Sequence, residues 1–463
     1  MALPDLVVTS RRAVLPDGVS DAAVVVHSGR IAAVVPSKKA PDAANRVDLG
    51  DVALLPGVVE SHAHLNEPGR EAWEGFETGT EAALAGGITT IVDMPLNSIP
   101  ATTTRKALEL KARTAAGRCR TDYAFWGGVV PGNAGELEPM LDLGACGFKC
   151  FLIDSGVPEF PASGELELGR AMPILAKRGA PLLVHAELEG TAPGTGGPGE
   201  SFRTPGGGDA RRYSSYLASR PRAWENEAIR MMIRLAKETG CRTHIVHLSS
   251  SDALADLAEA RRQGVPISAE TCPHYLTFAA EDIPDGATQF KCAPPIRERE
   301  NREKLWQGLA EGVLDMIVSD HSPCEPSLKK LDAGSFFEAW GGISSLQFSL
   351  PASWTGMKER GLGLEKLGRW MSEAPAALAG LSNKGRLAAG MDADFVAFDP
   401  EAAFEPAPST VRHKHKLTPY SGRKLFGRIS RVWLRGEAAY VDGYAKPPAG
   451  ARQGRTKAAR VNA

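Results

Sequence analysis

Residues 54–64, Leu-Leu-Pro-Gly-Val-Val-Glu-Ser-His-Ala-His, form a short apolar run that ends in two histidines. In a β-strand the side chains at positions i and i+2 point to the same face, so His62 and His64 aim at one point. Imidazole is a preferred ligand of zinc and of similar divalent ions. Two exposed histidines can share this spacing by chance, so the pair alone indicates a metal site only weakly.

Residues 54–61 are the first of eight apolar runs, and most of these runs are separated by segments of helical periodicity. Eight β/α units in succession predict an α/β protein with a (β/α)8 TIM-type barrel. A doubly wound open sheet is the alternative. The other seven expected strands are residues 88–94, 123–130, 147–151, 181–185, 243–247, 265–269 and 315–320.

Both chain ends have a different sequence pattern, with short β-rich runs between glycine and proline turns. We expect residues 1–53 plus 386–463 to form one small discontinuous β-sandwich domain, and residues 54–385 to form the barrel. The stretch 190–209 is rich in Gly, Pro, Ser and Thr and should be a loop. The basic tail, residues 446–463, is expected to be a solvated terminus.

Composition excludes several classes of protein. The 463 residues carry 54 Lys and Arg against 55 Asp and Glu, which argues against a chain that coats nucleic acid or an anionic membrane. No apolar run is long enough for a transmembrane helix, and the N-terminus lacks the pattern of a signal peptide. Seven scattered cysteines fit free thiols in a reducing compartment, so we expect a cytoplasmic protein without nucleic-acid or membrane partners.

Three more ligand-type residues lie at the ends of expected strands. His185 ends the fifth, His247 the sixth and Asp320 the eighth. The C-terminal ends of all strands in a parallel barrel meet at one mouth, where the active site of this fold lies. His244 lies three positions before His247 and faces the other way, so we expect it to be structural. The set as a whole predicts a metal centre.

Lys149 ends the fourth strand, where a ligand is expected. An ammonium has no lone pair to offer a metal, and burial beside cations disfavours it. A lysine carboxylated by carbon dioxide is instead an anion that can bridge two metals. Two divalent cations set against this carbamate, Asp320 and a hydroxide leave a single positive charge, which would acidify bound water. An ion-paired lysine is the ordinary alternative.

The chain resembles the cyclic amidohydrolases of the amidohydrolase superfamily, most closely the allantoinase branch, over nearly its whole length. The similar motifs begin with Glu-Ser-His-Ala-His-Leu-Asn-Glu-Pro-Gly-Arg and include Gly-Phe-Lys-Cys-Phe, Cys-Pro-His-Tyr-Leu and Ser-Asp-His-Ser-Pro-Cys. They lie at residues 55–70, 74–80, 147–151, 184–187, 244–250, 272–276, 291–297, 319–324, 340–343 and 415–423.

This resemblance implies a centre of two divalent metal ions. His62, His64 and Asp320 would hold the first ion, and His185 and His247 the second. The nitrogen and oxygen ligands suit zinc best, although cobalt, manganese, nickel or iron could also bind.

The resemblance also implies the roles of the remaining residues. Lys149, carboxylated as N6-carboxylysine, would bridge the metals. Asn97 and Ser322 would hydrogen-bond the substrate ring, and Cys292 lies on a loop that cradles it. Asp320 would be the catalytic residue that carries a proton from a metal-bridging hydroxide to the leaving nitrogen. A homotetramer is the usual assembly of the family.

The choice of substrate depends on residues outside the metal set. Dihydroorotases usually have an arginine two residues after the histidine pair, which suits a carboxylate. This chain has Asn66 there, and we expect its neutral amide to bind a neutral ring or ureido group of the substrate. Hydantoinases and dihydropyrimidinases usually have a tyrosine shortly after the bridging lysine, and residues 150–155 contain none. Both differences favour ring opening of allantoin to allantoate, an amide hydrolysis in purine catabolism.

Four other functions remain as alternatives. Hydantoinase or dihydropyrimidinase activity is the first, and dihydroorotase activity is less favoured. A scaffold homologue without activity would have lost ligands that this chain keeps. A mononuclear deaminase on the same barrel would not need Lys149.

Overall fold

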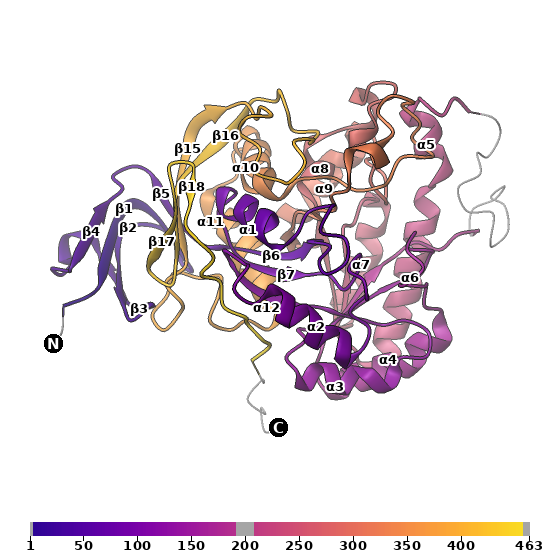
Figure 1. Ribbon diagram of the computed structural model, residues 1–463, viewed down its shortest axis with the longest axis horizontal. Helices are drawn as coiled ribbons and strands as arrows, with labels where there is room; N and C mark the ends of the chain where they lie inside the picture. Colours follow the sequence, from indigo (N-terminus) through magenta and orange to yellow (C-terminus); the bar gives the residue numbers. More distant parts are fainter. Residues whose placement is uncertain (1–2, 191–207, 457–463) are drawn as a thin grey trace.

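Eight parallel strands alternate with helices and close into a barrel, so the fold predicted from the sequence is confirmed (Figure 1). The computed structural model describes residues 3–190 and 208–456. The barrel strands are β6 (Val58–Ala63), β7 (Ile88–Asp93), β8 (Asp122–Phe125) continued by β9 (Gly127–Gly128), β10 (Phe148–Phe151), β11 (Leu182–His185), β12 (Thr243–Ile245), β13 (Ile267–Thr271) and β14 (Met316–Ile317).

The barrel closes between its first and last strands. Ala63, at the end of β6, pairs in parallel with His321, shortly after β14. Glu60 joins the same two strands, because its carboxylate accepts hydrogen bonds from the amides of His62 (2.8 Å) and Ser319 (2.9 Å). This closure brings the two predicted ligand segments, residues 62–64 and residue 320, side by side.

The helices surround the strands, and most follow a strand directly, as in a βα unit. Apolar residues such as Leu168 and Met172 of α4 or Ile229 and Met232 of α6 are buried against the barrel. The helices are α1 (Phe76–Ala85), α2 (Arg105–Ala115), α3 (Leu137–Asp142), α4 (Glu165–Lys177), α5 (Tyr213–Ser219), α6 (Arg222–Thr239), α7 (Leu254–Arg262), α8 (Pro273–Thr277), α9 (Arg299–Ala310), α10 (Ser349–Glu359), α11 (Leu364–Gly368) and α12 (Ala374–Ala379). None of the described helices is both long and apolar enough to cross a bilayer.

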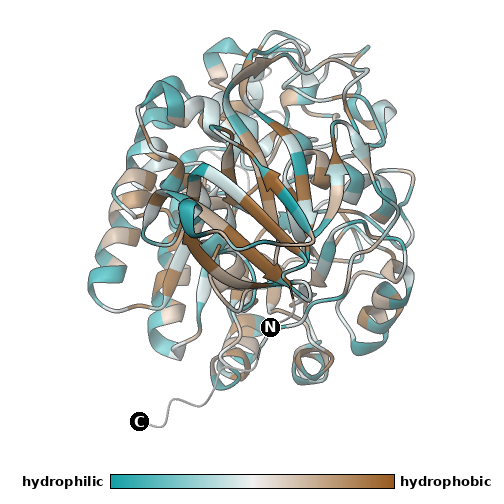
Figure 2. Cartoon of the chain, turned by 90° about the vertical axis from the view of Figure 1, so that its left-hand side faces the viewer, coloured by the Kyte–Doolittle hydropathy of each residue, from teal (hydrophilic) through white to brown (hydrophobic). Residues whose placement is uncertain are grey.

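The two chain ends form one mixed nine-stranded sheet beside the barrel, in the order β18-β17-β16-β15-β5-β1-β2-β3 with β4 paired to β1. Apolar side chains from both ends, among them Val8, Val24, Phe395 and Trp433, share one core. Figure 2 looks onto this sheet and shows hydrophobic residues concentrated on its strands. The strands are β1 (Leu6–Leu15), β2 (Gly18–His27), β3 (Arg30–Pro36), β4 (Asn45–Asp48), β5 (Ala53–Pro56), β15 (Phe395–Phe404), β16 (Leu425–Leu434), β17 (Glu437–Val441) and β18 (Tyr444–Ala445).

The apolar run that we expected to be the first barrel strand is in fact two strands. β5 pairs with β15 of the end sheet, and only β6 belongs to the barrel. The chain passes from one to the other at Gly57, where a Cβ atom would lie 2.2 Å from the hydroxyl of Thr89. The expected domain boundary after residue 53 therefore falls inside β5.

The described part of the basic tail, residues 446–456, is mostly exposed to solvent as expected, but hydrogen bonds also hold it against the barrel. The amide of Tyr123 donates to the carbonyl of Ala451, and the amide of Gln453 donates to the carbonyl of Tyr123. Arg455 donates to the carbonyls of Arg178 and Gly179 at the end of α4. The positive charges thus bind backbone carbonyls at the base of the barrel. Residues 457–463 and most of the expected loop 190–209 lie outside the described residues.

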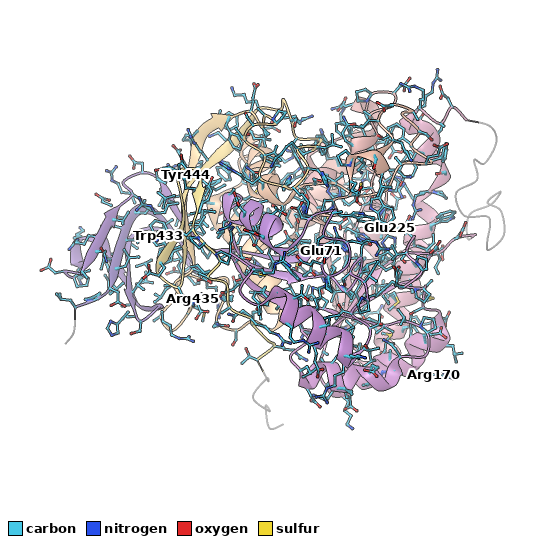
Figure 3. All side chains as sticks on the ribbon, in the orientation of Figure 1. Glu71, Arg170, Glu225, Trp433, Arg435 and Tyr444 are labelled. Atoms are coloured by element: carbon cyan, nitrogen blue, oxygen red, sulfur yellow. The ribbon has the colours of Figure 1, made fainter. Side chains whose placement is uncertain are left out.

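A buried cluster of charges joins the end sheet to the base of the barrel. Lys384 Nζ lies 2.5 Å from Asp122, 2.9 Å from Asp392 and 2.6 Å from Asp394. Arg435 adds an ion pair with Asp122, and Figure 3 shows Arg435 on the side of the end sheet next to the barrel. The three carboxylates could hold a cation, but the Lys384 ammonium already lies between them.

We expect Lys384→Met to lower the free energy of unfolding by about 3–5 kcal/mol, because it leaves three buried carboxylates without their shared ammonium. Urea unfolding followed by circular dichroism measures the change. Lys358→Met is the matched control, since Lys358 pairs with Glu401 at the surface and should cost less than about 1 kcal/mol. Equal effects of the two substitutions would contradict this role of the cluster.

His274, in α8, is fully buried, and neither ring nitrogen has a hydrogen-bond partner among the described residues. Burial, with a smaller contribution from the charge of His62, lowers the pKa of His274 from 6.5 to about 3. Between these two values the unfolded chain takes up a proton that the folded chain does not. The free energy of unfolding therefore falls as the pH falls from 6.5 towards 3.

At pH 5 we expect His274 to have removed about 2 kcal/mol of stability relative to pH 7. Urea unfolding of the metal-stripped wild type and of His274→Phe, at both pH values, isolates this term. The variant should lose less stability on acidification than the wild type. The same loss in both proteins would show that His274 does not titrate in this way.

Candidate functional site

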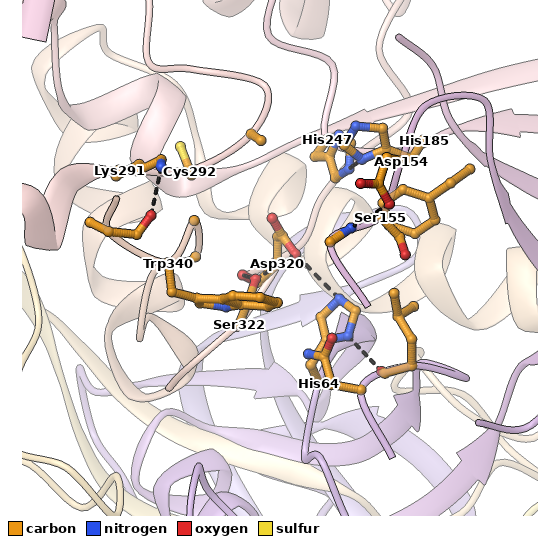
Figure 4. A pocket seen from close by; sticks show the side chains of 18 of the residues that line it. His64, Asp154, Ser155, His185, His247, Lys291, Cys292, Asp320, Ser322 and Trp340 are labelled. Carbon is orange, nitrogen blue, oxygen red and sulfur yellow. Dashed lines mark hydrogen bonds and ion pairs between the residues drawn. The ribbon is translucent and has the colours of Figure 1, made fainter. Parts of the chain in front are cut away.

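The predicted metal ligands meet in one cavity of about 350 Å³ at the C-terminal ends of the barrel strands (Figure 4). Each side chain is carried by a strand end or by the first residues after it, as a parallel barrel requires. All six are nearly or fully buried. The predicted ligands among the residues that line the cavity are His62, His64, Lys149, His185, His247 and Asp320.

The first group consists of His62, His64 and Asp320. Asp320 Oδ1 lies 3.2 Å from His62 Nε2 and 3.7 Å from His64 Nε2. One nitrogen or oxygen from each of the three residues lies within 4.8 Å of the others, so one cation could contact all three. Asp320 has a positive φ of 42°, a rare backbone conformation that follows directly after the strand end.

The second group consists of His185 and His247, whose Nδ1 and Nε2 atoms face each other at 2.9 Å. Phe151 stacks on His185 with ring centroids 4.4 Å apart. Burial lowers the pKa of His185 to about 4, although a hydrogen bond to Glu187 opposes the shift, and burial also holds the pKa of His247 well below its usual value. Both rings are therefore neutral at neutral pH, which is the form that binds metals.

Lys149 lines the same cavity, and its Nζ is buried without a hydrogen-bond partner among the described residues. Burial lowers the pKa of this amine to about 8, against the opposing charges of Glu270 and Asp320. A buried ammonium without a partner among neutral imidazoles is unfavourable. The neutral histidines and Asp320 therefore form a donor set that fits divalent metal ions.

Glu270 is an important residue that the sequence reasoning missed. Its Oε1 lies 2.5 Å from His62 Nδ1 and accepts a hydrogen bond from the His247 amide, while its Oε2 lies 3.0 Å from His244 Nε2. Burial alone raises the pKa of Glu270, but the charge of His62 and the hydrogen bond with His244 outweigh it and hold the pKa below its usual range. A carboxylate within the otherwise uncharged strand β13 was the available signal.

The residues expected to contact substrate fall into two groups. Asn97, Ser322 and Cys292 line the cavity, and Ser322 Oγ donates to Asp320 Oδ1 at 3.0 Å. Asn66 does not line it. Its side chain accepts from Asn97 Nδ2 at 3.0 Å and donates to the Pro323 carbonyl at 3.3 Å. The structure thus places Asn66 behind Asn97.

The wall opposite the metal ligands is formed by loops held in place by lysines. Lys291 Nζ donates to the carbonyl of Ala339 at 2.5 Å, and Lys329 Nζ donates to the carbonyl of Trp340 at 3.0 Å. Burial is the main cause that lowers the pKa of Lys291 to about 7. Figure 4 shows the ring of Trp340 close to Asp320 and Ser322. The sequence reasoning selected Cys292 on this wall and missed the two lysines.

Comparison with known proteins gives a consistent picture. The model of the amidohydrolase family matches residues 53–439. An allantoinase from Streptomyces avermitilis is 48% identical over 450 residues, which cover 96% of this chain and 98% of that protein. Allantoinases from Arabidopsis thaliana and Saccharomyces cerevisiae are 43% and 45% identical, over 94% and 86% of this chain and 88% and 85% of those proteins.

Solved structures with the same fold carry a related name. The L-hydantoinase (dihydropyrimidinase) from Arthrobacter aurescens superposes with a TM-score of 0.89 at 32% identity, over 96% of this chain and 98% of that chain. The dihydropyrimidinase from Brevibacillus agri gives a TM-score of 0.87 at 26% identity, over 98% and 99% of the two chains. The relatives by sequence and the neighbours by structure are therefore named for hydrolysis of different cyclic amides.

Proposed function

Because the chain belongs to the amidohydrolase family, we propose that it is a metal-dependent hydrolase that opens the hydantoin ring of allantoin to give allantoate. The convergence of four histidines, a lysine and an aspartate in one buried cavity carries the proposal of metal-assisted amide hydrolysis. The name shared by relatives that are 43–48% identical supports allantoin as the substrate.

The cofactor in this proposal is a pair of divalent metal ions, with zinc the best match to the nitrogen and oxygen donors. His62, His64 and Asp320 would hold one ion, and His185 and His247 the other. Lys149, carboxylated by carbon dioxide, would supply the shared anionic ligand. The bound metals would polarise the ring carbonyl and provide a nucleophilic water at neutral pH.

Asp320 is the proton carrier in this reaction. The water oxygen bonds to the ring carbonyl carbon, and the carbon–nitrogen bond of the ring breaks. Asp320 takes the proton of the attacking oxygen and returns it to the leaving nitrogen, acting first as base and then as acid. The hydrogen bond from Ser322 to Oδ1 orients the carboxylate for this transfer.

Asn97, Ser322 and Cys292 are proposed to hold the ring, because all three line the cavity beside Asp320. Asn66 does not contact the ring itself but fixes the side-chain amide of Asn97 through a hydrogen bond. The two asparagines thus form a neutral amide pair. Dihydroorotate carries a carboxylate, which an arginine at this position would bind better.

Hydantoin ring opening is the second candidate, and the superposition on the Arthrobacter aurescens enzyme favours it. The two candidates share the chemistry at the metals and differ only in the group attached to the ring. The sequence relatives favour allantoin, since they are closer in identity than the structural neighbours.

We also propose a cytoplasmic homotetramer. The seven free, buried cysteines support a reducing compartment. The assembly follows from the family resemblance alone, and light scattering of the purified protein would measure it.

We expect metal-loaded protein, supplied with bicarbonate, to open allantoin faster than hydantoin, dihydrouracil and dihydroorotate. A chelator should abolish turnover of all four compounds, because the neutral histidines alone cannot polarise a carbonyl. Product formation by chromatography measures each rate. Faster turnover of hydantoin or dihydrouracil would overturn the choice of substrate, and full activity with chelator would overturn the metal mechanism.

Asp320→Asn is the control for the chemical step in the same assay. The amide keeps the size of the side chain but cannot accept the proton, so turnover should fall at least about 1,000-fold while the circular dichroism spectrum stays unchanged. Turnover near that of the wild type would exclude Asp320 as the proton carrier.

The carbamate on Lys149 makes a separate prediction. Protein purified with metal and ¹³C-labelled bicarbonate should show one carbamate carbon resonance per chain by NMR. Lys149→Met should lack this resonance and should bind less metal, because it removes the shared anionic ligand. Lys291→Met, which changes another buried lysine of the cavity, should keep the resonance. A resonance that persists in Lys149→Met would place the modification elsewhere.

A further inference from the structure

Two charged residues beside the second pair of histidines have no role in the chemistry described above. Glu187 follows strand β11 by two residues and is completely buried. It lies 2.8 Å from His185 Nε2. Arg220, from the turn between α5 and α6, binds both carboxylate oxygens, with its Nε 3.1 Å from Oε1 and a second nitrogen bonded to Oε2.

This contact determines which nitrogen of His185 is free. An ionised carboxylate only accepts hydrogen bonds, so His185 Nε2 must carry the proton that it shares with Glu187. In the neutral ring, Nδ1 then has the lone pair, and Nδ1 is the atom that faces His247. Figure 4 shows the two rings together at one side of the cavity.

Arg220 keeps the carboxylate in its ionised and oriented form. The guanidinium neutralises the buried charge of Glu187 by direct contact with both carboxylate oxygens. The two-point contact also fixes the plane of the carboxylate, which a single ammonium could not do. Arg220 is itself held over the ring of Trp224 and by a hydrogen bond from Arg297 to its carbonyl.

The histidines of the first group have separate supports. His62 Nδ1 contacts Glu270, and His64 Nδ1 contacts the carbonyl of Leu96 at 2.8 Å. The Glu187–Arg220 pair therefore touches a ligand of only one of the two proposed ions. If the pair had only a general structural role, its loss would affect the binding of both ions.

We propose that Glu187 and Arg220 are positioning residues for the second metal ion, which they secure by holding His185 in the tautomer whose Nδ1 is the ligand. The inference rests on the two-metal centre of the proposed function and is independent of the substrate. Partners of this kind around metal-bound histidines typically change metal affinity by about 10- to 100-fold.

The test measures metal content and needs no substrate. Zinc-loaded wild type, Glu187→Gln and Arg220→Lys are dialysed against increasing concentrations of a chelator, and zinc per chain is measured by mass spectrometry. We expect two ions in the wild type. Both variants should release one ion at about 10- to 100-fold lower chelator concentration and keep the other as the wild type does.

Asp394→Asn is the matched control. Asp394 is also a buried carboxylate held by a cation, Lys384, and by a backbone amide, that of Arg435, but it lies in the cluster at the base of the barrel. It should lower stability and leave both ions bound as in the wild type. Thermal unfolding of every variant shows whether the chain is folded during the metal measurement.

A second readout reports the tautomer directly. In ¹⁵N NMR spectra of metal-free protein, the resonances of His185 should show a protonated Nε2 in the wild type and a mixture of tautomers in Glu187→Gln. The proposal is overturned if both variants keep two ions with unchanged affinity, if they lose both ions together, or if the wild type binds only one. A wild type that binds two ions but leaves allantoin intact would overturn the substrate and not this inference.

Discussion

The rest of the site depends on the hydrogen bonds made by one buried carboxylate, that of Glu270. One buried group contacts His62 and His244 and accepts the amide of His247, so it ties together residues of three barrel strands. Neutral imidazoles can be buried at low cost only if their outer nitrogens have partners. With Glu270 ionised, His62 is held with Nε2 towards Asp320. The same principle recurs at His185, where Glu187 takes the role of Glu270.

A second buried carboxylate joins separate segments of the chain at the opposite end of the barrel. Asp122, at the start of β8, accepts from Lys384, Arg435, Gln453 and the amide of Ala451. These donors come from the segment after α12, the end sheet and the C-terminal segment. The chain ends are thus fixed at the base of the barrel, and the cavity of the proposed active site lies at its mouth. Separating the two ends leaves the loops at the mouth free to vary without loss of the scaffold.

The sequence was sufficient to predict the barrel and the convergence of the six candidate ligands in one cavity, because both depend on local patterns. An apolar run that ends in His185 or Asp320 predicts a strand end whatever the rest of the chain does. Partners such as Glu270 and Arg220 could not be found in this way, since their roles arise from residues distant in sequence. The split at Gly57 was missed because two strands of different sheets follow each other with only one residue between them. The attachment of the tail to the barrel was not predicted, because its donors bind carbonyls, which composition does not reveal.

The division between strands and loops also explains why one fold serves several cyclic amides. The proposed metal ligands lie on strands or shortly after them, and a neighbour at 32% identity superposes almost throughout. The residues proposed to hold the ring lie on loops instead, with Asn97 after β7, Cys292 after β13 and Ser322 after β14. Loop residues can change without disturbing the strand ends, so the reaction is kept while the substrate changes. Substrate preference must therefore depend on these loops and on residues that position them, such as Asn66. The proposed metal chemistry acts on the ring amide and does not distinguish the substituents of the ring.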